Sequence, residues 1–200
     1  MFEKIKENLL ALGYEVSVFE NKETAAEYLN GRIDQTTVGI GGSVTVQEMG
    51  LFDLLDSHNR VYWHMGVADR EEAQAQREGA AAAEVYLTSV NGAAETGELI
   101  NIDGNGNRVA GTYYGHKKVY LILGKNKIAP DYDAALWRAR NIASPKNAKR
   151  LGAKTPCAVK GDRCYDCKSP GRICRGLSVF WAKPFSCDME VILINEDLGY

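Results

Sequence analysis

Two kinds of apolar segment are missing from this 200-residue sequence. No apolar run approaches the roughly 18 residues that a membrane-spanning helix needs, so we expect no membrane span. The opening residues, MFEKIKENLL, contain no apolar signal core. We therefore expect a cytoplasmic protein whose thiols are kept reduced.

Several recognisable motifs are also absent. No GxGxxG motif follows the first predicted strand, so we do not expect NAD as a cofactor; the run at 104–107 lies between two predicted strands and does not qualify. The basic part of the chain has no helix-turn-helix or aromatic platform, so nucleic acid is not an expected partner. No repeat with a period of about 20 to 50 residues is visible, which excludes a solenoid.

Cysteine is scarce and unevenly placed: the chain has five cysteines, and four of them lie within 18 residues. Cys157, Cys164, Cys167 and Cys174 form the pattern C-x6-C-x2-C-x6-C. The inner pair can hold one metal centre from a single turn, and the outer pair can fold back to complete four-sulfur ligation. The pattern predicts a metal or cluster loop over residues 154–176, with Cys187 outside the ligand set.

No histidine lies in this stretch, so the predicted ligands are all thiolates. Structural zinc sites usually pair two C-x2–4-C units, and only one is present here, which favours a [4Fe–4S] cluster over Zn²⁺. The spacing is also similar to the C-x6-C-x2-C-x5-C loop that holds a [4Fe–4S] cluster in DNA glycosylases of the endonuclease III kind. Two alternatives stay open: a disulfide or redox pair, and unligated thiols.

Charge is distributed unevenly, although the net charge is only −2. Residues 138–175 contain eleven Lys or Arg against two acids, Asp162 and Asp166, so this segment carries +9 and the remaining chain −11. One interpretation is a basic shell that stabilises four thiolates. The other is a surface that docks an anionic substrate or an acidic redox partner.

Helical and strand periods alternate along the chain. Predicted helices cover 2–12, 22–30, the second half of 44–55, 69–83, 131–142 and 144–151, and predicted strands cover 14–19, 36–40, 60–65, 85–90, 118–123, 177–182 and 190–194. Segments 99–103 and 108–113 are predicted to pair as a β-hairpin, and Gly31 is predicted to close the second helix. The pattern predicts one α/β domain over 1–200 with a mostly parallel, Rossmann-like sheet.

In such a sheet, ligands bind at the carboxyl ends of the strands. The turn Gly41-Gly42-Ser43 follows a short buried strand and leads into a helix, which is the geometry that presents bare N–H groups to an anion. His64 ends the strand at 60–65, and we interpret it as a core or rim histidine rather than a ligand.

Further candidates lie on later turns. Glu95 follows a strand end among small neighbours that let a substrate approach, so it is the candidate catalytic carboxylate, with Thr96 beside it. Lys127, in the run GKNK, brings an ammonium to the edge of the most hydrophobic strand and is the second catalytic candidate. Asn107 and Arg108 are predicted to join Gly41, Gly42, Ser43 and Thr96 in binding a small anion.

Five motifs, in their order and spacing, resemble the LUD domain family, the lactate utilisation proteins: GIGGSVTVQEMGL (39–51), ETGELINIDGNGNR (95–108), GKNKI (124–128), RARNIASPKNAKRL (138–151) and NEDLGY (195–200). The resemblance implies a fold akin to sugar-isomerase and CoA-transferase α/β domains. It also implies a role in oxidising lactate to pyruvate alongside iron–sulfur partner subunits. The four-cysteine segment is typical of a stand-alone branch.

Three functional hypotheses follow. The first is a redox component acting on lactate or another small 2-hydroxy acid, with Lys127 and Arg108 pairing the carboxylate and the four-cysteine centre carrying electrons or holding structure. The second is a transferase or isomerase of the CoA-transferase type, in which Glu95 is nucleophile or base and the metal is structural. The third is a non-catalytic subunit that docks on iron–sulfur partners. A homo-oligomer is compatible with each.

Overall fold

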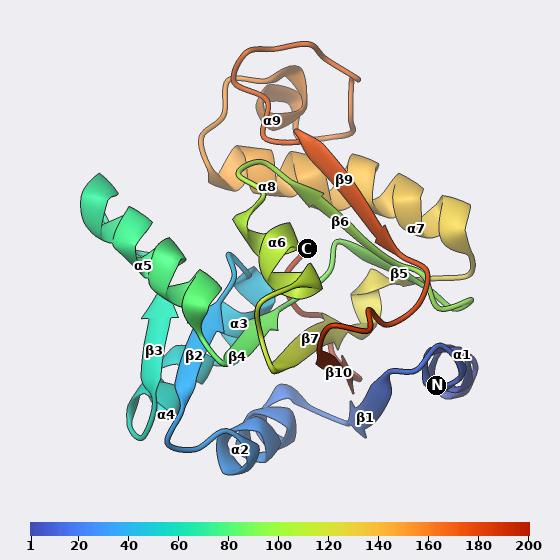
Figure 1. The fold of residues 1–200 in the computed structure, drawn as a ribbon. Coiled ribbons are helices and arrows are strands. Elements are labelled where there is room, and N and C mark those ends of the chain that lie inside the picture. Colours follow the sequence, from blue (N-terminus) through green and yellow to red (C-terminus); the bar gives the residue numbers. More distant parts are fainter.

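The computed structural model describes residues 1–200 of the protein. Six strands form a parallel sheet in the order β1-β10-β7-β4-β2-β3. These strands are β1 (Glu15–Phe19), β2 (Thr37–Ile40), β3 (Arg60–Trp63), β4 (Val85–Thr88), β7 (Lys118–Gly124) and β10 (Asp188–Ile194). The predicted α/β fold with a mostly parallel sheet is confirmed (Figure 1).

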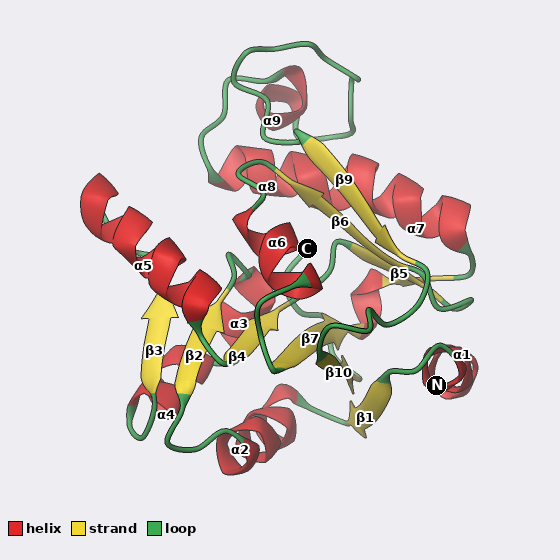
Figure 2. Cartoon of the chain, in the orientation of Figure 1, coloured by secondary structure: helices red, strands yellow, loops and turns green.

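A smaller sheet stands beside the large one (Figure 2). Its order is β8-β5-β6-β9, and β6 runs antiparallel to both of its neighbours. The strands are β5 (Gly92–Ala94), β6 (Leu99–Asp103), β8 (Ile128–Ala129) and β9 (Gly176–Phe180). The very short β5 and β8 were not predicted from sequence, because two or three residues carry no visible alternation.

Alternation along the central strands produces two cores, one on each face of the large sheet. On β7, Val119, Leu121 and Leu123 join one buried cluster, while Tyr120 and Ile122 join the other. Both faces are therefore covered, as a parallel sheet requires.

Helices supply this cover on both faces (Figure 1). One face packs against α5, α6 and the small sheet, and the other against α2, α3 and α4. The helices are α1 (Glu3–Ala11), α2 (Lys22–Arg32), α3 (Val44–Glu48), α4 (Leu51–Asp56), α5 (Arg70–Ala82), α6 (Asn107–Tyr113), α7 (Tyr132–Arg138), α8 (Ser144–Arg150), α9 (Pro156–Lys160), the 3₁₀ turn η1 (Lys125–Lys127) and the π-helical turn η2 (Ala139–Ala143).

The hairpin predicted over 99–103 and 108–113 is wrong in its second half, which is helix α6. The reason lies in Asp103, whose carboxylate accepts hydrogen bonds from the amides of Gly104, Asn105, Gly106 and Val109. This capping turns the chain into a helix, and β6 pairs with β5 and β9 instead.

Three predicted helix boundaries also need correction. Gly31 does not end the second helix, which continues to Arg32. The helix predicted in the second half of 44–55 is α4, which ends one residue later, at Asp56; a separate short helix, α3, precedes it, and Gly50 between them adopts a left-handed conformation with φ of 64°. The helices predicted over 131–142 and 144–151 run into one another as α7, η2 and α8, without the break expected between them. No helix in the structure combines the length and the apolar character needed to cross a membrane.

Candidate anion-binding site

A pocket of about 370 Å³ opens where the strands of the large sheet end. Its walls come from the turn after β2, the ends of β3 and β4, the β6–α6 loop, η1, α8, the cysteine-rich loop after α9, and Tyr200. The carboxyl ends of parallel strands meet at one edge, so residues far apart in the chain converge here.

Lys127 is the deepest cation of this pocket, with 4% of its surface exposed. Its Nζ donates to Thr45 Oγ1 at 2.7 Å and to Ser89 Oγ at 2.8 Å, and it forms no ion pair. Burial lowers the pKa of this ammonium to about 7, and the nearby charges of Arg138 and Arg108 contribute to the lowering. A lysine held by two neutral hydroxyls is a cation that lacks a counter-anion.

The segment after β10 covers this lysine. Gly199 has a φ of 61°, and a Cβ built on it would lie 3.3 Å from Lys127 Nζ and 2.6 Å from Thr45 Oγ1. Its amide donates to Glu48 Oε2 at 2.7 Å. Arg138 fixes the same segment, because Nη1 donates to the main-chain oxygen of Tyr200 at 3.1 Å. Glycine at 199 therefore lets the backbone close over the pocket floor.

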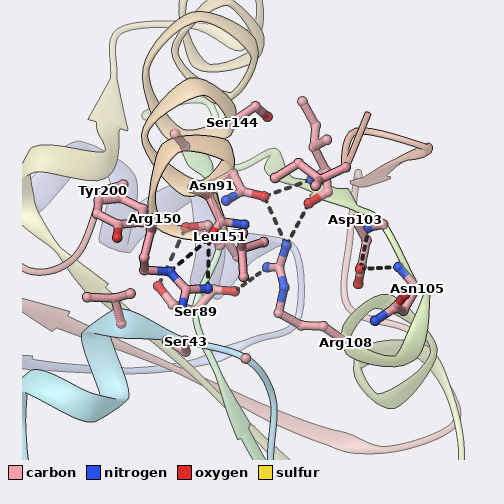
Figure 3. A pocket seen from close by; sticks show the side chains of 18 of the residues that line it. Ser43, Ser89, Asn91, Asp103, Asn105, Arg108, Ser144, Arg150, Leu151 and Tyr200 are labelled. Carbon is pink, nitrogen blue, oxygen red and sulfur yellow. Dashed lines mark hydrogen bonds between the residues drawn. The ribbon is translucent and has the colours of Figure 1, made fainter. Parts of the chain in front are cut away.

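Arg108 forms a second wall and is held in place by protein acceptors (Figure 3). Its guanidinium donates to the carbonyl oxygens of Ser89 and Ile102 and to the side-chain oxygens of Asn91 and Asn101. All of these acceptors are neutral, and Arg108 forms no ion pair. Burial lowers the pKa of this guanidinium, and Asp103 opposes the effect.

Further cations line the rest of the pocket: Arg77, Arg150, Arg172 and Arg175. None of them forms an ion pair. Asp103 is the only acidic residue in the lining, and both of its oxygens accept main-chain amides of the β6–α6 turn. The pocket is therefore strongly cationic, and an anion is the complement that its charge requires.

The structure brings most of the predicted anion-binding residues together. Gly42, Ser43, Asn107, Arg108 and Lys127 all line the pocket. The amides of Gly42 and Ser43 donate no hydrogen bond within the protein, whereas the Ser43 hydroxyl caps α3 by accepting from the amide of Val46.

Gly41 lies just outside this lining. Its amide belongs to the sheet and donates to Leu87 O, and its carbonyl accepts from Trp63 Nε1. A Cβ there would meet Thr88 Oγ1 and the Tyr86 hydroxyl at 2.8 and 2.9 Å, so glycine keeps this turn close to β4.

The structure does not bring Glu95 and Thr96 to the pocket. They form the β5–β6 turn, where Glu95 pairs with Lys4 at 2.9 Å and is about one-third exposed. Its main-chain oxygen accepts from Asn8 of α1, and the Thr96 hydroxyl donates to Glu98. A catalytic role for Glu95 stays a prediction, and it would require a substrate that binds beside α1.

The four clustered cysteines are free thiols on and after α9, in the loop at the top of Figure 1. No three His, Cys, Asp or Glu side chains lie close enough together to hold a metal ion in this structure. Two of these sulfur atoms accept hydrogen bonds: Arg172 donates to Cys174 Sγ at 3.4 Å, and the amide of Asp166 donates to Cys164 Sγ at 3.4 Å.

Hydrogen bonds from Ser169, with the charge of Arg172 adding, lower the pKa of the Cys167 thiol. Thiolate is the form that binds metal, so the donor set suits a metal or cluster. Cys187 differs, since it is buried in the core and burial raises the pKa of its thiol. The metal centre remains a proposal.

Fold and pocket together define the class: an α/β protein with a cationic cleft at the carboxyl edge of a parallel sheet. Within that class the chain belongs to the LUD domain family, whose sequence model matches residues 2–194. The match confirms the resemblance carried by the five motifs. Membership implies a role related to lactate utilisation.

One solved structure supports the fold independently. A crystal structure of a DUF162 family protein from Deinococcus radiodurans aligns with a TM-score of 0.51 at 13% sequence identity, covering 96% of this chain and 94% of that one. At this identity, the likeness shows a shared fold alone. Among curated proteins, no match to the sequence was found.

Several pocket residues are not predictable from the sequence alone. His64 lines the pocket, although its place at a strand end is typical of a core or rim histidine. Arg77 gives no signal, because one arginine among the polar residues of α5 is typical of a solvated face. Arg150, Arg172 and Arg175 belong to the basic segment 138–175, whose charge is the available clue.

Proposed function

We propose that this protein acts on lactate or a closely related small 2-hydroxy acid, whose carboxylate pairs with Lys127 at the pocket floor. The observation that carries the proposal is the state of Lys127: buried, bound only to the hydroxyls of Thr45 and Ser89, and without a counter-anion. A carboxylate supplies that charge. The two hydroxyls, each an acceptor as well as a donor, are in reach of a 2-hydroxyl group.

The four-cysteine loop supports a redox role because it contributes to the same pocket. Arg172, Ile173 and Arg175 lie within or directly beside the cysteine pattern and line the pocket. We propose that Cys157, Cys164, Cys167 and Cys174 hold a [4Fe–4S] cluster, with Zn²⁺ as the alternative. A bound cluster would supply an electron acceptor, whereas zinc would supply only structure. The physiological partners would then be other iron–sulfur subunits.

Calorimetric titration with lactate tests the carboxylate site. We expect binding by the wild-type protein and a loss of about tenfold or more in Lys127→Met, the range for removing one charged hydrogen-bond partner. Lys125→Met is the matched control, because Lys125 is exposed in the same turn and lies outside the pocket. Lactamide, which lacks the negative charge, should not bind. Equal affinity of the two variants for lactate would overturn the proposal.

Anaerobic visible spectroscopy and metal analysis test the redox part. An iron–sulfur protein should show broad visible absorbance that bleaches with dithionite. The bleached protein should regain its colour when the cluster is reoxidised. A colourless protein that contains stoichiometric zinc would remove electron transfer from the proposal and leave lactate binding to be tested separately.

A further inference from the structure

The carboxylate proposed at Lys127 leaves the cations of another part of the pocket unbalanced. His64 follows β3, Arg77 belongs to α5 and Arg150 ends α8, and all three line the pocket. Besides burial, the positive charges of Arg77 and Arg150 both lower the pKa of His64, while the carboxylate of Asp103, which lines the same pocket, raises it. A single carboxylate at the floor does not account for this cluster.

Both arginines are oriented without being neutralised. Arg77 Nη1 donates to the side-chain oxygen of Gln74 at 3.3 Å. Arg150 donates through Nε and Nη2 to the side-chain oxygen of Asn147, at 3.1 and 2.9 Å. In each case the partner is a neutral amide one turn earlier on the same helix. The guanidinium groups are therefore held in place with their charge available.

Two polar atoms in this cluster are buried and have no hydrogen-bond partner: Nδ1 of His64 and Nε of Arg77. Buried polar atoms are nearly always satisfied, so each of these points to a missing partner. Gly42 adds a third feature, because its amide is free and a Cβ on it would lie 3.4 Å from His64 Nε2. Glycine thus leaves open the space next to the imidazole.

We infer that His64, Arg77 and Arg150 form a second anion subsite, which binds a phosphate-type dianion at the mouth of the Lys127 pocket. Two guanidiniums and an imidazole from three different elements suit an oxyanion with acceptors in several directions, and guanidinium binds phosphate in a bidentate manner. The inference rests on the proposed function and deepens it. The hydroxy acid either carries the phosphoryl group itself or binds beside a separate phosphate-bearing compound.

Calorimetry with inorganic phosphate, at constant ionic strength, tests the subsite. We expect one site in the wild-type protein and an affinity loss of about tenfold or more in Arg77→Gln and in Arg150→Gln. Arg70→Gln is the matched control, since Arg70 lies on the same helix as Arg77 but outside the pocket. Circular dichroism and melting curves verify that the variants are folded. Absence of phosphate binding, or equal affinity in all three variants, would overturn the inference.

A third ligand distinguishes the two sources of phosphate. If one molecule carries both groups, 3-phosphoglycerate should bind more tightly than lactate or phosphate, and each of Lys127→Met and Arg77→Gln should weaken it. If the sources are separate, lactate and phosphate should bind together and 3-phosphoglycerate no better than phosphate. If the wild-type protein binds phosphate but not lactate, the proposed function is refuted and the phosphate subsite is retained.

Discussion

The Lys127 side chain is buried, and its surroundings determine whether the ammonium is charged near neutral pH. With a pKa near 7, the ammonium loses its proton within the physiological range, whereas an exposed lysine keeps it up to about pH 10. The affinity of the pocket for an anion can therefore change when Lys127 gains or loses one proton. Burial, with the charges of Arg77 and Arg150 adding, lowers the pKa of His64, and Asp103 opposes the effect.

Lactate affinity should therefore depend on pH in one direction. Below about pH 7 the affinity should be constant. Above about pH 7 the affinity should fall by about tenfold for each pH unit, because only protonated Lys127 pairs with the carboxylate. Titrations from pH 6 to pH 9 measure the slope, and Lys127→Met should show weak binding with no slope. Affinity that stays constant in the wild-type protein up to pH 9 would contradict the assignment of Lys127.

At the scale of single residues, the sequence predicts a pocket residue only where the neighbouring sequence pattern shows where that residue lies in the fold. Lys127 and Arg108 could be predicted because Lys127 lies in a polar turn after the most hydrophobic strand, and Arg108 directly follows the Gly-Asn run at 104–107. Arg77 could not, since its role depends on how α5 crosses β3, which is a matter of tertiary packing. The small neighbours of Glu95 suggest access for a substrate, and the structure explains them otherwise: a Cβ at Gly97 would meet the Leu12 side chain.

The contact between β2 and α5 sets how closely the large sheet and its helix approach. A Cβ on Gly39 of β2 would meet the main-chain carbonyl of Ala80 in α5, which cannot move without the helix. A Cβ on Gly31, within α2, would have no atom of another element within 4 Å. The same substitution should therefore have opposite effects at the two sites.

Gly39→Ala should destabilise the protein by about 1–3 kcal/mol, the usual cost of overpacking. Gly31→Ala should stabilise it by about 0.5–1 kcal/mol, because alanine restricts the unfolded chain and suits a helix interior. Urea denaturation of both variants measures the two changes. If Gly39→Ala left the unfolding midpoint unchanged, the close approach of β2 and α5 would be incorrect.

The cysteine loop makes a prediction of its own. Metal content should collapse in Cys164→Ala and persist in Cys187→Ala, because Cys164 belongs to the C-x2-C pair while Cys187 is buried in the apolar core. Elemental analysis of the purified proteins measures both. Equal loss in the two variants would remove the proposed ligand set.

Elements with a long apolar period were predictable, and those fixed by a single polar group were not. The strand at β7 could be recognised because it is the most hydrophobic one, and in the structure its residues alternate between two buried clusters. Helix α6 resembles a strand in sequence because its start depends on four amides that converge on Asp103, which is a three-dimensional arrangement. The caps Asn21, Asp69 and Asp131 are local features, since each directly precedes its helix and accepts a hydrogen bond from the first turn.

Across the whole molecule, buried titratable groups should give stability a maximum at mildly alkaline pH. Between about pH 7 and its ordinary 10.5, Lys127 is protonated in the unfolded chain but not in the folded one, so stability rises with pH. Burial raises the pKa of Tyr14 and Tyr86 above 10.0, so the unfolded chain loses these protons first and stability falls at higher pH.

Chemical denaturation of the unliganded protein at a series of pH values measures this curve. The free energy of unfolding should increase from about pH 7 to pH 9 and decrease above about pH 10. Lys127→Met should remove the increase and keep the decrease, because the tyrosines are unchanged. A wild-type curve that is flat from pH 7 to pH 9 would show that Lys127 remains charged in the folded protein.

The position of β10 has a consequence for biosynthesis. β10 lies between β1 and β7 in the large sheet, and it is the only neighbour of β1, with Glu15 opposite Glu190. A ribosome delivers β10 almost 170 residues after β1. Until then the emerging chain carries an unpaired strand and an open apolar edge at β7, which other chains can pair with. This protein should therefore depend on chaperones while it is being made, and much less once its last strand is in place.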